Sequence, residues 1–147
     1  MRAGLSSLAM LLLLVSRALV AQDRQVIHGP GEVQGLPFSL AVRVGNVLYL
    51  SGALGNLPAT RQLVDTGIVK QTQQTLENIQ TILAAAGSSL DRVFKCTVFL
   101  TNIADYAKMN EVYATYFPKD PPARSTVAGS GLALGARVEI ECMATVA

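Results

Sequence analysis

The chain has 147 residues, of which 50% are hydrophobic and 15% are charged. This is the length of one domain with enough apolar surface for its own core, and the low charge content excludes an intrinsically disordered chain. The 12 basic and 10 acidic residues give a formal net charge of +2, and the basic residues are scattered singly, so no nucleic-acid-binding surface is expected.

The first 21 residues have the pattern of a signal peptide. Arg2 precedes an apolar run over residues 9–15, and the small residues Ala18 and Ala21 frame a cleavage site. An uncleaved membrane anchor is the alternative, but the run is shorter than the about 20 apolar residues of a membrane span. We therefore expect export, to the periplasm or outside the cell, and a mature form that is not in the membrane. Cleavage removes two arginines and no acids, so the mature net charge is near zero.

A polar N-terminal segment, 22–36, precedes a domain expected over 37–147. Residues 38–44 and 47–51 are rich in β-forming side chains and flank Gly45-Asn46, which predicts a β-hairpin. A loop rich in Gly, Pro and Asn follows over residues 52–66.

The next segment predicts a helix, because apolar residues recur at spacings of three and four. The predicted apolar stripe consists of Val69, Thr72, Leu76, Ile79, Leu83 and Ala86. The solvent side is expected to carry Gln71, Gln73, Gln74, Glu77 and Gln80. Gly87 provides the C-cap, and a strand is expected over 93–101.

A second helix is expected from Ile103 to Phe117, with Asn102 as its N-cap. Its buried face is predicted to comprise Tyr106, Met109, Tyr113 and Tyr116. A further short strand around 125–128 and a long last strand over 136–146 complete the order. The last strand alternates, with Val138, Ile140, Cys142 and Ala144 on one face and Arg137, Glu139, Glu141 and Met143 on the other.

This order predicts an α+β fold, a mixed β-sheet with two helices on one face. Two helices cover only one face of a sheet, and the strand at 47–50 is apolar on both faces. We therefore expect a homo-oligomer in which a second copy covers the other face.

The sequence lacks the residues that several common kinds of catalytic and cofactor-binding site require. His28 is the only histidine and lies in the N-terminal segment, which disfavours Ser-His or Cys-His catalysis. A zinc site lacks ligands, and neither a P-loop nor a dinucleotide-binding glycine pattern is present, so no metal and no cofactor are expected. Cys96 and Cys142 lie in strand-like apolar runs and are expected to be buried thiols, although an oxidising compartment would allow them to pair.

Carboxylate and guanidinium chemistry remain. Arg124 follows a proline-rich loop, and a guanidinium matches a carboxylate with two parallel hydrogen bonds. Glu139 and Glu141 lie in a core-forming strand, and partial burial would raise a carboxyl pKa toward the range of a general acid or base. The alternatives are a solvated Arg124 and, for the glutamates, a solvated sheet face or an interface ion pair with Arg137.

Several segments together resemble the RidA (YjgF, reactive imine/enamine deaminase) family. They are the hairpin ending in Ser51-Gly52, residues 71–79 and 84–87 of the first helix, residues 95–100 of the central strand, residues 110–113 of the second helix, the loop Pro-Ala-Arg-Ser at 122–125 and the strand Val-Glu-Ile-Glu at 138–141. The resemblance covers Pro37 to Thr145.

The resemblance implies a chorismate-mutase-like fold, a homotrimer with sites between subunits, and cofactor-free hydrolysis of 2-imino acids of the 2-aminoacrylate type to 2-keto acids and ammonia. It implies that Arg124 anchors the substrate carboxylate and that Glu139 activates water. Asn110 and Ser51 would line the cleft and bind substrate, together with the residues at the positions of Phe38 and Thr126.

The chain departs from the family pattern at these last two positions and in the hairpin. Archetypal members have tyrosine where this chain has Phe38, and often cysteine where it has Thr126. The hairpin continues with Ala53-Leu54 where Gln-Ile is usual. Losing one neutral hydrogen bond costs on the order of 1 kcal/mol, which weakens activity without abolishing it.

Two other functions are consistent with the same resemblance. One is a non-catalytic, holdase-like or small-carboxylate-binding trimer. The other is ribonuclease activity, against which the near-neutral mature charge and the absence of a catalytic histidine argue.

Overall fold

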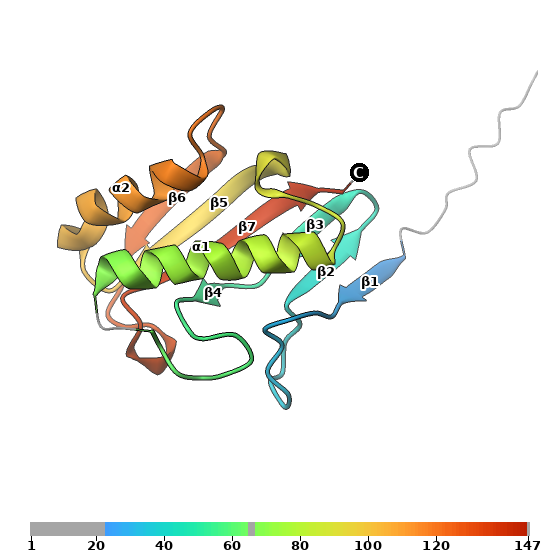
Figure 1. Cartoon of the computed structure of the whole chain (residues 1–147), viewed down its shortest axis with the longest axis horizontal. Coiled ribbons are helices and arrows are strands. Elements are labelled where there is room, and N and C mark those ends of the chain that lie inside the picture. The colour runs from blue at the N-terminus through green and yellow to red at the C-terminus, as the bar shows by residue number, and fades with distance from the viewer. Residues whose placement is uncertain (1–22, 65–66, 147) are drawn as a thin grey trace, which may run out of the picture.

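The strands of this protein form one mixed sheet. The structure is a computed structural model that describes residues 23–64 and 67–146. Its strands are β1 (Arg24–Ile27), β2 (Ala41–Val44), β3 (Val47–Leu50), β4 (Ala53–Leu54), β5 (Val93–Leu100), β6 (Ala123–Ala128) and β7 (Val138–Thr145). The order across the sheet is β1-β2-β3-β7-β5-β6, with β4 also paired to β7 (Figure 1). Only β5 and β6 run parallel among these strands.

Both helices of the described chain, α1 (Ile68–Ala85) and α2 (Tyr106–Tyr116), lie on the same face of this sheet (Figure 1). The predicted α+β class, with a mixed sheet and two helices on one face, is confirmed. Short 3-10 turns precede β5, α2 and β7. Neither helix combines the length and the hydropathy that a membrane crossing would require.

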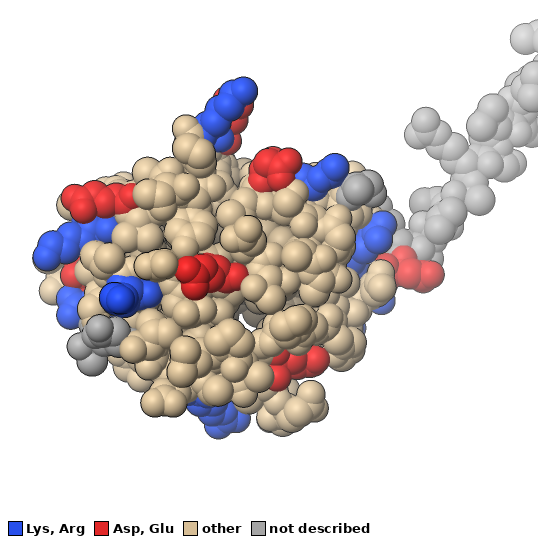
Figure 2. Space-filling model, viewed as in Figure 1, with Lys and Arg blue, Asp and Glu red and all other residues tan. Residues whose placement is uncertain are grey.

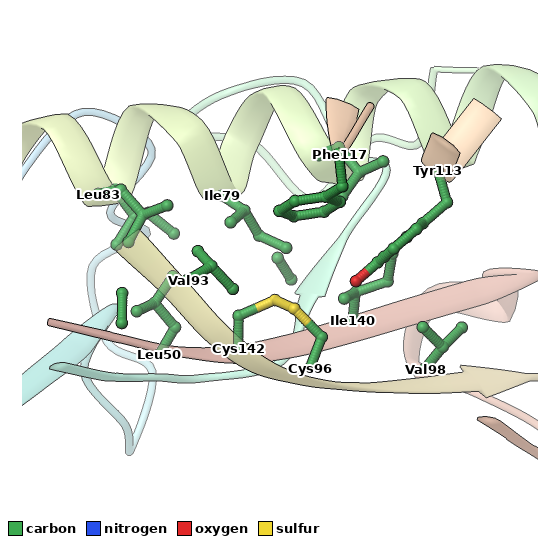
Figure 3. Close-up of a cluster of buried hydrophobic side chains, with 14 of the residues drawn as sticks. Leu50, Ile79, Leu83, Val93, Cys96, Val98, Tyr113, Phe117, Ile140 and Cys142 are labelled. Atoms are coloured by element: carbon green, nitrogen blue, oxygen red, sulfur yellow. A yellow bond between two sulfur atoms is a disulfide. The ribbon is translucent and has the colours of Figure 1, made fainter. Parts of the chain in front are cut away.

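Strand β7 is central, and its burial alternates along its whole length. Its even-numbered residues, from Val138 to Ala144, are buried beneath the helices, and the odd-numbered ones lie on the opposite face. Figure 3 shows the resulting core, where Ile79 and Leu83 of α1 and Phe117 pack over β5 and β7. The predicted alternation is confirmed for the residues within β7.

Helix α1 differs from the predicted stripe at two positions. Val69 is 43% exposed, and Gln71, predicted on the solvent side, is 1% exposed. The side-chain oxygen of Gln71 accepts a hydrogen bond of 2.8 Å from the backbone N–H of Arg137, just before β7. A buried amide is tolerated where it satisfies a backbone donor, and hydropathy alone does not show such a partner.

The buried face of helix α2 also differs in part from the prediction. Met109 and Tyr113 are buried as predicted, whereas Tyr106 is 40% exposed and Tyr116 is partly buried. Tyr106 begins the helix after a 3-10 turn, beyond the densest part of the core. The side chain of Asn102 accepts a hydrogen bond from the backbone N–H of Ala104, so the predicted N-cap is confirmed on the 3-10 turn.

The N-terminal segment contributes a strand that the sequence pattern did not indicate. Strand β1 pairs antiparallel with β2, and Arg24 and Gln25 are exposed. An edge strand gains main-chain hydrogen bonds on one side without needing alternating apolar side chains. The predicted signal peptide, residues 1–21, lies outside the described residues, so cleavage and export stay predictions.

The face of the sheet away from the helices is uncovered within the chain. Tyr49 is 45% exposed and Val127 is 49% exposed on this face, which also carries Phe99 and Met143. An apolar sheet face of this kind is commonly covered by another protein surface. It is the face for which the sequence predicts a second copy.

The expectation of free thiols is wrong. Cys96 of β5 and Cys142 of β7 are directly opposite in the antiparallel register and form a disulfide (Figure 3). Both residues point into the core and are at most 2% exposed. The sequence showed that each cysteine is buried, but only the pairing of β5 with β7 shows that they face each other.

We expect the disulfide to stabilise the fold, because it closes a chain segment with a sequence separation of 46. Closing a loop of this length reduces the entropy of the unfolded chain by an amount worth roughly 2–4 kcal/mol. The double variant Cys96→Ala/Cys142→Ala should lose that much free energy of unfolding in a urea titration followed by circular dichroism. A reductant should destabilise the wild type but not the variant. Because the reduced wild type keeps both sulfur atoms, this comparison separates the effect of the disulfide bond from that of the cysteine side chains. Equal stability of the oxidised and reduced wild type would contradict the prediction.

Candidate functional site

Arg124 lies in β6, directly beside Cys96 of β5, and its side chain is on the face covered by α2. One terminal nitrogen, Nη2, donates to Oδ1 of Asn110 at 2.6 Å and to the hydroxyl oxygen of Tyr106 at 3.3 Å. The guanidinium carbon lies 4.6 Å from the ring centre of Tyr113. Cation–π contact and hydrogen bonds therefore hold the guanidinium in one place.

The partners of Arg124 are all neutral. Among the described residues no carboxylate pairs with it, whereas Arg137 forms a bidentate ion pair with Asp105 at 2.7–3.0 Å. Burial raises the pKa of Tyr113 to about 12, so its phenol stays protonated. A half-buried cation held by neutral groups keeps its attraction for an anionic ligand.

Two further groups belong to this cluster. Thr126 follows Arg124 by two positions in the strand and is on the same face, and its buried Oγ1 has no hydrogen-bond partner among the described residues. Two side-chain hydrogen bonds lower the pKa of the Tyr106 phenol: the one with Asn110 has the larger effect and the one with Arg124 the smaller. We call Arg124, Asn110, Thr126, Tyr106 and Tyr113 the arginine cluster.

Glu139 lies on the opposite face of the sheet, in β7, next to Phe99 of β5 and Leu54 of β4. Burial raises the pKa of its carboxyl above the usual range, and the charge of Glu141 raises it further. Within the chain Arg137 pairs with Asp105 and not with Glu139.

Gly52 makes room for this carboxyl group. A Cβ atom at position 52 would lie 1.9 Å from Oε1 of Glu139, so only glycine allows this approach. Ser51, the preceding residue, donates from Oγ to the backbone oxygen of Ser39 at 2.7 Å. Ser51, Gly52 and the 59% exposed Phe38 all line one cavity of about 270 Å³. We call Glu139, Ser51, Gly52 and Phe38 the glutamate cluster.

The six residues predicted for the site therefore fall into two groups within one chain. Arg124, Asn110 and Thr126 lie together beside α2, and Glu139 projects from the opposite face of the sheet against Gly52. Ser51 and Phe38 line the cavity that Gly52 also lines. Because the sheet separates Arg124 from Glu139, one protomer does not form a site that contains both side chains.

Sequence reasoning missed Tyr106, Tyr113 and Gly52 as parts of these clusters. Tyr106 precedes Asn110 by four residues and Tyr113 follows it by three, which is the spacing of one helix face. That spacing was available from the sequence. Nothing in the sequence alone indicated that Gly52 would meet Glu139.

Comparison with known proteins identifies the family. The family described as Endoribonuclease L-PSP matches residues 33–146, which is most of the chain. The chain belongs to this family, and the resemblance to RidA (YjgF) proteins is confirmed.

Curated relatives and a solved structure agree with this family assignment. Over 109 residues the chain is 44% identical to Reactive Intermediate Deaminase A of Arabidopsis thaliana, covering 74% of this chain and 58% of that longer protein. It is 43% identical to the 2-iminobutanoate/2-iminopropanoate deaminase of Mus musculus, covering 74% of this chain and 80% of the relative. The crystal structure of TdcF from E. coli with bound serine superposes with a TM-score of 0.76 at 31% identity, covering 84% of this chain and 99% of TdcF.

The raised pKa of Glu139 gives a direct test of this geometry. In an NMR titration Glu139 should titrate above the usual range for glutamate, and Glu141→Gln should lower its pKa part of the way, because burial remains. Glu111→Gln, an exposed change on α2, should leave it unaltered. Since ionisation is more costly in the folded state, Glu139→Gln should stabilise the protein at neutral pH and lose this advantage in acid. An unshifted Glu139 would contradict its burial.

Proposed function

We propose that this protein hydrolyses 2-imino acids, and their enamine tautomers, to 2-keto acids and ammonia. The observation that carries the proposal is Arg124, a fixed guanidinium with neutral partners and no carboxylate partner in the part of the chain that the structure describes. Two relatives bear the names of imine or reactive-intermediate deaminases, and TdcF was crystallised with serine, itself a small carboxylate.

Arg124 would bind the substrate carboxylate through the nitrogens that do not contact Asn110 and Tyr106. A bidentate pair fixes both the position and the rotation of a planar carboxylate. The adjacent C=N carbon is then held in one orientation toward the water, which lowers the entropic part of the barrier.

Glu139 would act as general base and then as general acid. With the protonated imine, the Glu139 carboxylate takes a proton from water as the water oxygen bonds to the imine carbon, and the electron pair of the C=N bond moves to nitrogen, which gives a carbinolamine with a hydroxyl and an NH2 group. The carboxyl then returns this proton to the NH2 group, the C–N bond breaks, and ammonia leaves. The hydroxyl proton passes to the Glu139 carboxylate as the ketone forms and then to ammonia, so the products are the 2-keto acid and ammonium. A raised pKa suits these transfers, because it brings the carboxyl closer to neutrality.

A homotrimer with its sites between subunits is part of the proposal. Arg124 of one protomer and Glu139 of its neighbour would face the same cleft, since the sheet separates them within one chain. The uncovered apolar face around Tyr49 and Val127 supports the association of protomers through their sheets.

Variants of the two clusters test the reaction. With imino acid produced by an amino-acid oxidase, Glu139→Gln should lower kcat by about 100-fold or more, since it removes the base. Arg124→Ala should lower kcat/KM by on the order of 100-fold, because the substrate is no longer fixed. The exposed Arg24→Ala is the control. If keto-acid release with Arg124→Ala equals the wild type, the assignment is wrong; saturable binding of 2-keto acids without turnover would instead indicate the non-catalytic alternative.

Mixing the two inactive variants tests where the site lies. When Arg124→Ala and Glu139→Gln chains are unfolded, mixed in equal amounts and refolded together, each mixed trimer contains one cleft with both groups intact. About a quarter of wild-type activity should return, and none should return when either variant is refolded alone. Failure of properly assembled mixed trimers to regain activity would contradict a site between subunits.

A further inference from the structure

The cavity of about 270 Å³ lies on the helix side of the molecule, between α1, the loop 51–61 and the N-terminal segment 30–40. Figure 2 shows this face with a hollow near its middle. The side chains that line it are mainly apolar and include Val33, Leu36, Phe38, Leu40, Leu54 and Ile82. It is separate from the arginine cluster, none of whose members line it.

The cavity adjoins the proposed general base. Gly52 lines it, and the carboxyl of Glu139 lies against Gly52 so closely that no side chain fits there. Leu54 also lines it and is the register partner of Glu139 across β4 and β7. The carboxyl of Glu139 therefore lies directly behind the part of the cavity wall that Gly52 forms.

Polar side chains around the cavity are mostly engaged within the protein. The amide of Asn78 donates to the backbone oxygens of Leu54 and Asn56 at 3.0 and 2.9 Å. Asn56 donates to the backbone oxygen of Thr60 at 2.8 Å, and Thr81 donates to that of Glu77 at 3.0 Å. The charged residues Glu32 and Arg61 also line the cavity, but most of its lining is apolar.

Two apolar side chains that line this cavity are exposed to solvent in the single chain. Phe38 is 59% exposed and Leu134 is 50% exposed. Leu134 has φ of +58°, in the left-handed region that leucine rarely adopts. Strain of this kind persists where the surrounding structure holds it, often near binding sites.

The departures from the family pattern fall on this same cavity. Phe38, Ala53 and Leu54 all line it. Phenylalanine in place of tyrosine removes a hydroxyl, and alanine in place of glutamine removes a long polar side chain. Both changes make the cavity less polar, and the second also makes it larger.

We propose that this cavity receives the side chain of the substrate and selects 2-imino acids with large apolar side chains, such as those derived from leucine or phenylalanine, over the one derived from alanine. The inference rests on the proposed function and specifies its substrate class. A methyl group would leave most of the cavity to water. Each further buried methylene contributes about fourfold to binding of the transition state.

Imines made from alanine, leucine and phenylalanine by an amino-acid oxidase provide the test with the intact protein. The value of kcat/KM should be at least about tenfold higher for the leucine-derived imine than for the alanine-derived one. A ratio of one or less would overturn the inference while leaving the deaminase assignment intact. If no imine reacts faster than it does spontaneously, the proposed function fails. Calorimetry then decides the inference: 4-methyl-2-oxopentanoate should bind at least tenfold more tightly than pyruvate, and equal affinity would overturn it.

Filling the cavity should remove the preference. Thr81→Phe introduces a large side chain at an exposed lining position of α1, and Ala53→Gln fills it from β4. Both should lower the ratio of leucine to alanine kcat/KM, or of the two keto-acid affinities, to below about threefold. Gln80→Phe, at the neighbouring exposed position that does not line the cavity, is the matched control and should keep the wild-type ratio. If Thr81→Phe folds and keeps that ratio as well, the side chain does not occupy this cavity.

Discussion

The alternation of β7 is the constraint on which the arrangement of this protein depends. Its place between β3 and β5 gives it neighbours on both sides, and every second side chain is buried beneath the helices. This burial fixes the register of the sheet, because a shift by one residue would place Glu139 in the core. The same register sets Cys142 opposite Cys96 and presents Glu139 to the other face.

Two ionisable groups in this structure are held in costly states. Arg124 is half-buried and pairs with no acid in residues 23–64 and 67–146, and Glu139 has a raised pKa because of burial and the nearby Glu141. A structure selected only for stability would pair or remove such groups, as Asp105 does for Arg137. The pattern is that of a site in which a ligand supplies the missing charge and water completes the remaining contacts.

In the mechanism that we propose, the glutamate cluster would link the reaction to the choice of substrate. Gly52 is the contact between the two, since it touches the carboxyl of Glu139 and also lines the apolar cavity. In the proposed arrangement the charged end of a substrate and its side chain would be bound by different parts of the fold. The reaction and the selectivity could then vary independently, because the proposed anion site lies on β6 and α2 and the cavity is formed by the N-terminal segment, the loop after β3 and α1.

The sequence by itself determined the hairpin, both helices, the alternation of β7 and, through the family resemblance, every member of the two clusters except Tyr106, Tyr113 and Gly52. Periodicity reveals which side of an element is buried, and these elements have strong periodicity. Only the tertiary structure decided that Cys96 meets Cys142, that Gln71 is buried against the backbone of Arg137, and that Arg124 and Glu139 are on opposite faces of one sheet. Each of these depends on which strands pair and in what register, and pairing is set by contacts between segments far apart in the chain.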